Sequence, residues 1–177
     1  MPNKNLTPVL ENYLEIIFYE QSKHGAARAS SIAAAAGVSR STVTSALKVL
    51  KQDGYVEYEP YSLIYLTDEG MAIGRDIAHR HLIFLEFFEH VLKLESAEAN
   101  AVSCELEHVV PPEVIRRLGQ FVLYLRSKKE LWKNWQDEYP KVRKKHVQSV
   151  TKNAQKQREA LKNSNPTEEE LLTQNYR

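Results

Sequence analysis

The chain has 177 residues, of which 42% are hydrophobic and 27% charged, the balance of one globular domain or of two small ones. It contains no apolar run near the roughly 20 residues of a membrane helix, and its N-terminus does not resemble a secretory signal. A single cysteine cannot form an internal disulfide, so we expect a cytoplasmic protein with no membrane partner.

The formal net charge of +1 hides an uneven distribution. Residues 1–126 carry 12 Lys and Arg against 16 Asp and Glu, whereas residues 127–177 carry 12 against 7. A DNA-binding motif in the acidic part must therefore draw its affinity from local basic residues rather than from overall charge.

Helix formers dominate and only 6 glycines are present, so the sequence predicts a mainly α fold. Thr7-Pro8 starts a first helix, with Thr as the cap and Pro at the first helical position, and Gly25 ends it. A short Ala-rich helix is expected over 27–36. After a tight turn, a further helix runs from Ser39 to about Asp53.

Two β-type runs, 55–60 and 63–67, predict a small hairpin with its turn at Tyr61-Ser62. Three helices are expected beyond it: 68–93, a helix that Ser96 caps and that ends before Pro111-Pro112, and 113–126. Residues 127–177 form a basic extension that is expected to be partly helical, in parts of 128–138 and 141–162, or disordered.

The order helix, short helix, turn, helix and hairpin is typical of a winged helix-turn-helix. Ile32 and Ala35 are expected to pack against Val43, Leu47 and Leu50, which leaves the N-terminal end of the second helix exposed. Hydroxyl side chains, one Arg and a helix N-terminus suit the base edges and phosphates of a major groove. The residues expected to contact DNA are Arg28, Ser39, Arg40, Ser41, Thr42, Thr44, Ser45 and Lys48, with Lys51 as a further backbone contact. The alternative is a pair of helices whose Ser and Thr residues only cap the helix and keep its surface soluble. The β-hairpin predicted directly after these helices favours DNA binding.

The sequence CELEH places Cys104, Glu107 and His108 at i, i+3 and i+4, which share one face of a helix. Thiolate, carboxylate and imidazole together suit Fe²⁺, Co²⁺, Ni²⁺ or Zn²⁺ better than Mg²⁺ or Ca²⁺. Three ligands on one turn make an incomplete site, so others must come from elsewhere. Candidates are His79, His81 and His90 on the long helix and Glu11, Asn12 and Glu15 on the first. The competing interpretation is a buried thiol beside a solvated Glu-His pair.

Several motifs together resemble the diphtheria-toxin-repressor family of metal-activated repressors, which includes iron-dependent regulators and manganese transport regulators. They are N-Y-L-E-I-I in the first helix, the winged helix, R-H in the long helix and C-E-L-E-H-V-V-P-P-E-V-I-R-R-L, and they cover about residues 6–126. The resemblance implies a winged helix-turn-helix domain at 1–67. It also implies an all-helical metal-binding and dimerisation domain at 68–126, which leaves 127–177 as an extension.

The resemblance also implies the metal ligands. Cys104, Glu107 and His108 match ligand positions, and His81 matches the histidine of the long helix. Two further positions lie on the first helix. Glu15 matches a ligand position of the manganese type, and Asn12 stands where iron-type members have Met and manganese-type members have Asp. Leu85 and Asn100 depart from the second metal site of the iron type.

We therefore predict a metal-activated repressor, not an enzyme, that binds palindromic operators of metal-homeostasis genes as a homodimer. Because a thiolate disfavours Mn²⁺, Fe²⁺ is the first choice of metal and Mn²⁺ the second. The basic C-terminal tail offers a possible additional contact. Two alternatives stay open: a metal-independent winged-helix regulator, and a metallohydrolase, for which the sequence has no HExxH and no phosphate loop.

Overall fold

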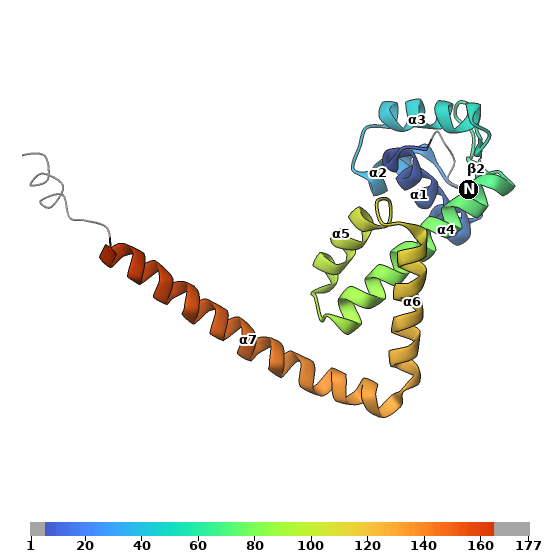
Figure 1. Ribbon diagram of the computed structural model, residues 1–177. Helices are drawn as coiled ribbons and strands as arrows, with labels where there is room; N and C mark the ends of the chain where they lie inside the picture. Colours follow the sequence, from blue (N-terminus) through green and yellow to red (C-terminus); the bar gives the residue numbers. More distant parts are fainter. Residues whose placement is uncertain (1–5, 165–177) are drawn as a thin grey trace, which may run out of the picture. The chain divides into compact units, whose positions relative to one another are not determined.

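The computed structural model describes residues 6–164, with side chains described over 6–159. The elements follow in the order α1 (Pro8–His24), α2 (Ala29–Ala36), α3 (Arg40–Gln52), β1 (Val56–Glu57), β2 (Tyr65–Leu66), α4 (Asp68–Leu85), the π-helix η1 (Glu86–Val91), α5 (Ser96–Leu106), α6 (Pro112–Ser127) and α7 (Lys129–Ser164) (Figure 1). The predicted mainly α fold is confirmed. The described part of the chain forms two compact units, which divide between Tyr124 and Leu125. Within residues 6–164, no helix is long and apolar enough to span a bilayer.

The starts of α1, α3 and α4 and the end of α1 follow the local sequence. The Thr7 hydroxyl accepts a hydrogen bond from the Leu10 N–H at 3.3 Å and caps α1, and Gly25 ends that helix in the left-handed region at φ 80°. Ser39 caps α3 and Thr67 caps α4 in the same way as Thr7 caps α1. Because a short side-chain oxygen satisfies an otherwise unpaired backbone N–H, these boundaries can be predicted from the sequence alone.

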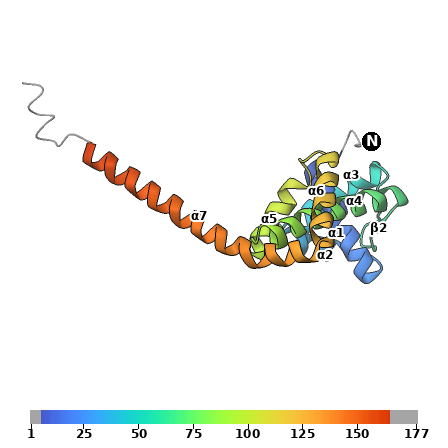
Figure 2. The same cartoon turned by 60° about the horizontal axis from the view of Figure 1, so that its bottom comes forward.

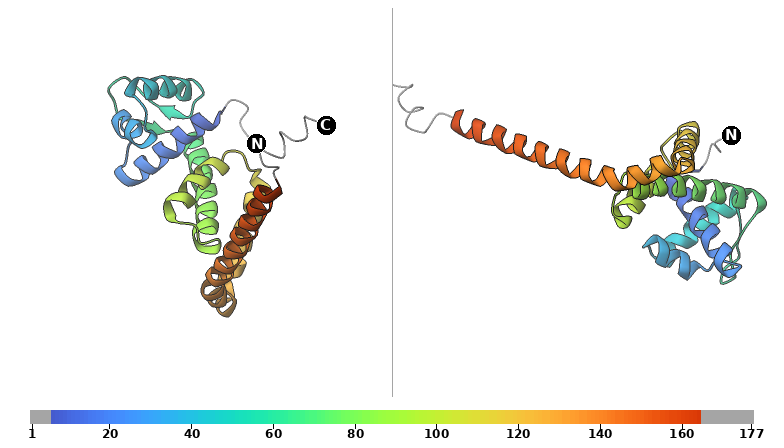
Figure 3. Two further views of the ribbon diagram at one scale, coloured as in Figure 1. Left: turned by 90° about the vertical axis from the view of Figure 1, so that its left-hand side faces the viewer. Right: turned by 90° about the horizontal axis from the view of Figure 1, so that it is seen from below.

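The first three helices and the hairpin pack around one apolar core. Leu14 and Ile17 of α1, Ile32 of α2 and Leu47 of α3 are all fully or almost fully buried there. The strands pair antiparallel, and the left view of Figure 3 shows them next to α3. One detail of the predicted packing is wrong: Ala35 is exposed, because the inner face of the short helix is formed by Ile32 and its neighbour Ala33.

α1 and α4 cross in close contact at Gly74. A Cβ atom at this position would lie 3.0 Å from the Leu14 carbonyl oxygen and 3.0 Å from Phe18 Cβ, so any other residue would have to push the two helices slightly apart. Beyond the crossing, α5 lies beside the second half of α4 (Figure 2). Consequently α1, α4 and α5, which are far apart in the sequence, meet at one place.

Several helix boundaries differ from those predicted. α2 begins at Ala29 rather than at Ala27, and the N-cap of α5 is Glu95, so Ser96 is its first helical residue and not its cap. α4 ends at Leu85 and continues as the π-helix η1, where the widened turn coincides with stacking of the Phe84 and Phe88 rings, whose centroids are 5.9 Å apart. α5 ends at Leu106 rather than just before Pro111. α7 runs without interruption through Pro140, an exposed position at which a break was expected. The tail predictions beyond residue 164 lie outside the described residues.

Candidate functional site

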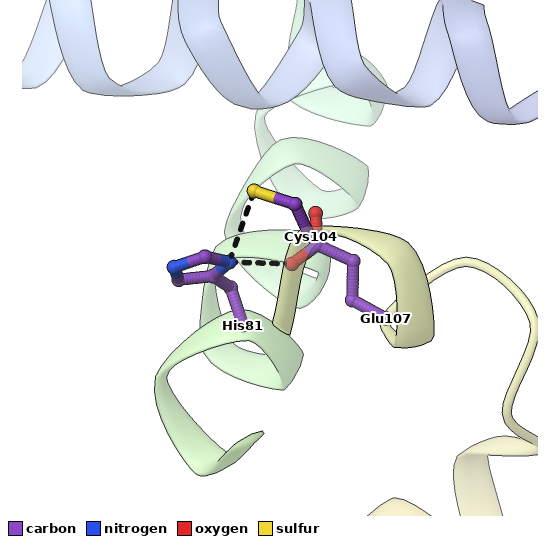
Figure 4. A group of neighbouring side chains, drawn as sticks. All are labelled: His81, Cys104 and Glu107. Atoms are coloured by element: carbon purple, nitrogen blue, oxygen red, sulfur yellow. Dashed lines mark hydrogen bonds and ion pairs between the residues drawn. The ribbon is translucent and has the colours of Figure 1, made fainter. Parts of the chain in front are cut away.

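Glu107 lies at the centre of a polar cluster where α1, α4 and α5 meet. Its side chain is fully buried, and its Oε2 lies 2.7 Å from Nδ1 of His81 on α4. The Cys104 sulfur lies 3.8 Å from the same nitrogen (Figure 4). One ligand atom from each of these three residues lies within 4.8 Å of the others, so the three side chains could bind one metal ion together.

His108 connects the cluster to α1. It lies in the turn that follows α5, which ends at Leu106. Its Nδ1 lies 2.7 Å from Oε2 of Glu11 on α1, and its Nε2 lies 3.3 Å from Oε1 of Glu107. Glu107 therefore stands between two imidazoles, with one carboxylate oxygen toward each.

Glu15 brings a second buried carboxyl group from α1. Only 6% of this residue is exposed, and burial raises its pKa to about 7, with a further upward contribution from the charge of Glu107. The two carboxyl groups also share a hydrogen bond, which favours the protonated form of Glu15. Such a pair holds a proton in a place where a cation would allow both groups to be ionised.

The other titratable groups of the cluster respond to the same carboxylates. The hydrogen bond to Glu107 raises the pKa of His81, and the hydrogen bond to Glu11 raises the pKa of His108. Burial of its sulfur, followed by the charge of Glu107, raises the pKa of the Cys104 thiol to about 11, although the residue as a whole is exposed by area. A cation would reverse these effects, because a metal favours thiolate and neutral imidazole.

One oxygen of Glu107 tests whether the cluster fits a metal. Oε1 is buried and has no hydrogen-bond partner among the described residues, because His108 Nε2, although close enough for an ion pair, is not aligned with it. A buried carboxylate oxygen without a partner is costly unless a positive charge satisfies it. Two carboxylates, two imidazoles and one thiol around this atom are a donor set that fits a divalent transition metal.

One predicted ligand, Asn12, makes no described contact with the cluster. Asn12 is half-buried on α1, and within residues 6–159 no described interaction connects its amide to the other groups. Its neighbour Glu11 makes the contact instead, which the sequence alone did not show because the rotation of α1 relative to α5 cannot be read from spacing. Of the other candidate histidines on the long helix, His79 is exposed, and His90 is exposed and lies 3.7 Å from Glu86.

Solvent reaches one side of the cluster through a groove of about 600 Å³. Glu11 and His108 line it, together with Arg80 of α4 and the loop that includes Val109 and Pro111. An ion could therefore approach the His108 side of the cluster from solvent without unfolding of the surrounding helices.

Four of the eight residues predicted to contact DNA line a second groove, between α3 and the hairpin; they are Arg28, Arg40, Thr44 and Lys48. This groove has a volume of about 630 Å³, and Arg28, Arg40 and Lys48 place three positive charges along it. Tyr61, at the tip of the hairpin, also lines the groove and is fully exposed; the sequence had indicated it only as a turn residue. Lys51 pairs with Glu59 of the hairpin, so it braces the hairpin against α3.

The hydroxyl groups of α3 are engaged with their own helix. Ser39 Oγ caps the helix and lies 2.7 Å from Ser41 Oγ and 2.8 Å from Thr42 Oγ1. The Thr44 and Ser45 hydroxyls donate to backbone carbonyls one turn earlier. These residues are exposed except Thr44, which is half-buried, so they satisfy the helix and still present oxygen atoms outward.

Two family models match successive parts of the chain. Residues 5–64 match the iron dependent repressor, N-terminal DNA binding domain, and residues 67–131 match the iron dependent repressor, metal binding and dimerisation domain. His81, Cys104, Glu107 and His108 lie in the domain whose description names metal binding. The groove beside α3, together with Glu11 and Glu15, lies in the domain whose description names DNA binding.

Solved structures agree with this match. The manganese regulator SloR is 27% identical, with a TM-score of 0.59 over 67% of this chain and 55% of SloR. ScaR with bound Cd²⁺ is 28% identical, with a TM-score of 0.53 over 65% of this chain and 54% of ScaR. IdeR of T. acidophilum, at 20% identity and a TM-score of 0.56 over 66% of this chain and 54% of IdeR, shares the fold. This chain spans about half the length of these proteins. Across both matched regions, the chain belongs to the iron-dependent repressor family of metal-dependent transcriptional regulators.

Proposed function

We propose that this protein is a cytoplasmic repressor that binds palindromic operators of metal-homeostasis genes as a homodimer when a divalent metal is bound. The observation that carries the proposal is the position of Glu107, buried between His81, His108 and Glu15 with one oxygen left without a hydrogen bond. These side chains come from α4, α5 with its following turn, and α1. We propose no catalytic role.

His81, Cys104, Glu107, His108 and Glu15 are the groups that would hold the ion, with Asn12 as a neutral oxygen donor beside them. When bound, the ion supplies a positive charge that lets both carboxyl groups and the thiol be ionised. We favour Fe²⁺ and place Mn²⁺ second, because Cys104 adds a soft donor that Mn²⁺ binds poorly. The imidazoles bind as neutral rings, so they must lose the protons that the carboxylates help them to hold.

Glu11 is the positioning residue for His108. Its carboxylate lies 2.7 Å from Nδ1 of His108 and fixes the proton there, which leaves Nε2 directed toward Glu107. A carboxylate that accepts from one ring nitrogen while the other faces a metal is a common support for histidine ligands. In this chain the support that Glu11 gives to His108 would strengthen the site from α1. Asn12, at the position of a family ligand, could then be a weak donor without loss of the site.

α1 is the element that connects metal binding with DNA reading. Leu14 and Ile17 belong to the core that carries α3, while Glu11 and Glu15 face the cluster. Without neutralisation, the carboxylates of α1 and Glu107 repel each other, so α1 is held less firmly against α4 and α5. If the protein has two positions of α3 relative to the cluster, metal increases the population of the one with the higher metal affinity. The ratio of the two metal affinities sets the size of this shift.

Exposed apolar side chains support the homodimer. Leu82 on α4 and Phe121, Leu123 and Tyr124 on α6 are each about half or more exposed. Side chains of this size at neighbouring helical positions are typical of a surface that another subunit covers. A two-fold dimer would present two copies of α3, which suits an operator with two-fold symmetry.

The test compares operator binding with and without metal. Duplexes would be selected from a random library by the full-length protein in Mn²⁺, and their affinity measured with Fe²⁺ under anaerobic conditions, with Mn²⁺ and with chelator. We expect Cys104→Ala and His108→Ala each to abolish the stimulation by metal and to leave the helical content unchanged. Arg40→Ala should weaken binding by about 10-fold or more while the response to metal persists.

Equal affinity in chelator and in metal would instead favour a winged-helix regulator that responds to another ligand. If both ligand variants retained the full response to metal, the cluster would have no part in the regulation.

A further inference from the structure

One stretch of α7, residues 141–158, carries positive charge without any negative charge. Residues 141–158 include seven Lys and Arg and no Asp or Glu. Every side chain from 140 to 159 is exposed, so this charge faces solvent along five turns of helix. Packing against an apolar core does not explain this part of the helix, because none of its side chains is buried. Its positive charge is therefore the feature that could bind a partner.

The lysines of this segment are arranged along one face. Lys141, Lys145, Lys152 and Lys156 stand at i, i+4, i+11 and i+15, which places them within an arc of about 60° over a length of about 22 Å. Lys141 already pairs with Glu138 at 2.9 Å. We call Lys145, Lys152 and Lys156 the lysine stripe.

We propose that the lysine stripe binds the phosphate backbone of duplex DNA and supplies sequence-independent affinity to the repressor. Duplex DNA carries one negative charge per about 1.7 Å of its axis, so a row of ammonium groups on a straight helix meets phosphates in any sequence. The proposal rests on the proposed function, which brings the chain to DNA. The lysine stripe would also add positive charge for DNA binding, which residues 1–126 lack because they carry more Asp and Glu than Lys and Arg.

Two other occupants fit the helix less well. A membrane-surface helix buries a continuous face of large apolar or aromatic side chains. Within 141–158, the face opposite the lysine stripe carries Val147, Val150 and Ala154, and the charged Arg143 interrupts it. Pairing with α7 of a second copy would bring two uniformly positive segments together, and like charges repel. DNA is the partner whose charge complements this segment without requiring an apolar face.

The experiment measures the salt dependence of DNA binding by the full-length protein. The stripe variant is Lys145→Gln, Lys152→Gln and Lys156→Gln together. The matched control removes the same charge elsewhere, through Lys23→Gln, Lys129→Gln and Lys133→Gln, all exposed positions. A third variant with Arg at the three stripe positions keeps the charge. Affinity for selected operator and for duplex of unrelated sequence is measured across a range of KCl concentrations.

We expect the slope of log affinity against log salt to become shallower by about 0.9 for each lysine that reaches a phosphate, and therefore by up to about 2.7 in the stripe variant. The loss should be similar on operator and unrelated DNA, with the ratio between them and the response to metal kept. The Arg variant should retain the wild-type slope. The matched control should change the slope by less than about 0.9, the value expected for one lysine.

Three results would overturn the proposal: equal slopes in the stripe variant and the matched control, a stripe variant that loses binding only to phosphatidylserine vesicles, or one that changes only the mass of the oligomer in sedimentation. Failure of the proposed function would look different. It would appear as operator binding that ignores chelator and Arg40→Ala, whatever the slope of the stripe variant.

Discussion

The polar cluster around Glu107 and the N-terminal end of α3 are both groups of polar side chains, but they differ in how they are held. The α3 hydroxyls bond to atoms at most four residues away and remain largely exposed. In the cluster, Glu11 and His108 are 97 residues apart, and Glu107 and Glu15 are buried. One group is complete within its own helix, whereas the other depends on the packing of three separate segments.

The two groups also differ in whether their hydrogen bonds are satisfied. At α3 each hydroxyl has a partner, so DNA would have to be read by side chains that already have a defined position. In the cluster, two carboxyl groups compete for protons, and Glu107 Oε1 has no hydrogen bond among the described residues. The electrostatic free energy of the buried cluster should therefore change much more on binding a cation than that of the exposed hydroxyls of α3.

The largest effect is expected from Glu107→Gln. This substitution keeps the size of the side chain but removes the charge between His81 and His108, so affinity for Mn²⁺ and Co²⁺ should fall by about 100-fold or more. Titration calorimetry measures that affinity. The metal-free variant should unfold at the same urea concentration as wild type or higher, because a poorly satisfied buried charge has been removed.

Glu105→Gln is the matched control for this change, since Glu105 is exposed on the same helix and should leave metal affinity unaltered. If the Glu107→Gln protein bound metal as tightly as wild type, the buried carboxylate would not be a metal ligand, and the contrast drawn between the cluster and α3 would be wrong.

A smaller loss, of about 10-fold in metal affinity, is expected from Glu11→Gln, because the amide holds the His108 ring less firmly than the carboxylate does. The pKa of His108 should fall at the same time, which NMR of the ring protons can follow in the metal-free protein. Glu20→Gln on the same helix should change neither. An unchanged His108 titration in the Glu11 variant would contradict the contact with α1.

The stability of the metal-free protein should fall as the pH rises. The pKa of Glu15 is raised from 4.5 to about 7, so between these values the folded chain binds more protons than the unfolded chain. The raised pKa values of His81 and His108 act in the same direction: their stabilisation is complete below about 6.5 and is lost as the pH rises through the folded values.

We expect a decrease of about 1–2 kcal/mol in the free energy of unfolding between about pH 5.5 and pH 8, after allowance for partial exposure of the groups. Urea denaturation at each pH measures it. With saturating Mn²⁺ the trend should reverse, because metal and protons compete for the same atoms. Parallel curves with and without metal would show that these groups do not bind the ion.

What the sequence could predict follows the same division. Capping residues such as Thr7, Ser39 and Thr67 act on their own helices, so the starts of α1, α3 and α4 were predictable, as was the hairpin turn. The family resemblance placed His81, Cys104 and Glu107 near one another. It did not show Glu11, because the partner of His108 depends on where α5 ends and on the α1–α4 crossing at Gly74.

The smallest effect is expected on the α3 side, from Ser39→Ala. The hydroxyl of Ser39 caps the helix, so its loss should lower stability by about 1 kcal/mol and allow the first turn of α3 to fray. Ser45→Ala is the control, because that hydroxyl only donates to a carbonyl within the helix and its removal costs little. Urea denaturation gives the stability, and calorimetry should give the wild-type metal affinity for both variants, since the interactions of α3 end within its own turns. A fall in metal affinity that matched the loss of stability in Ser39→Ala would instead mean that the cluster senses the order of α3 directly, and the two regions would have to be treated as one cooperative unit.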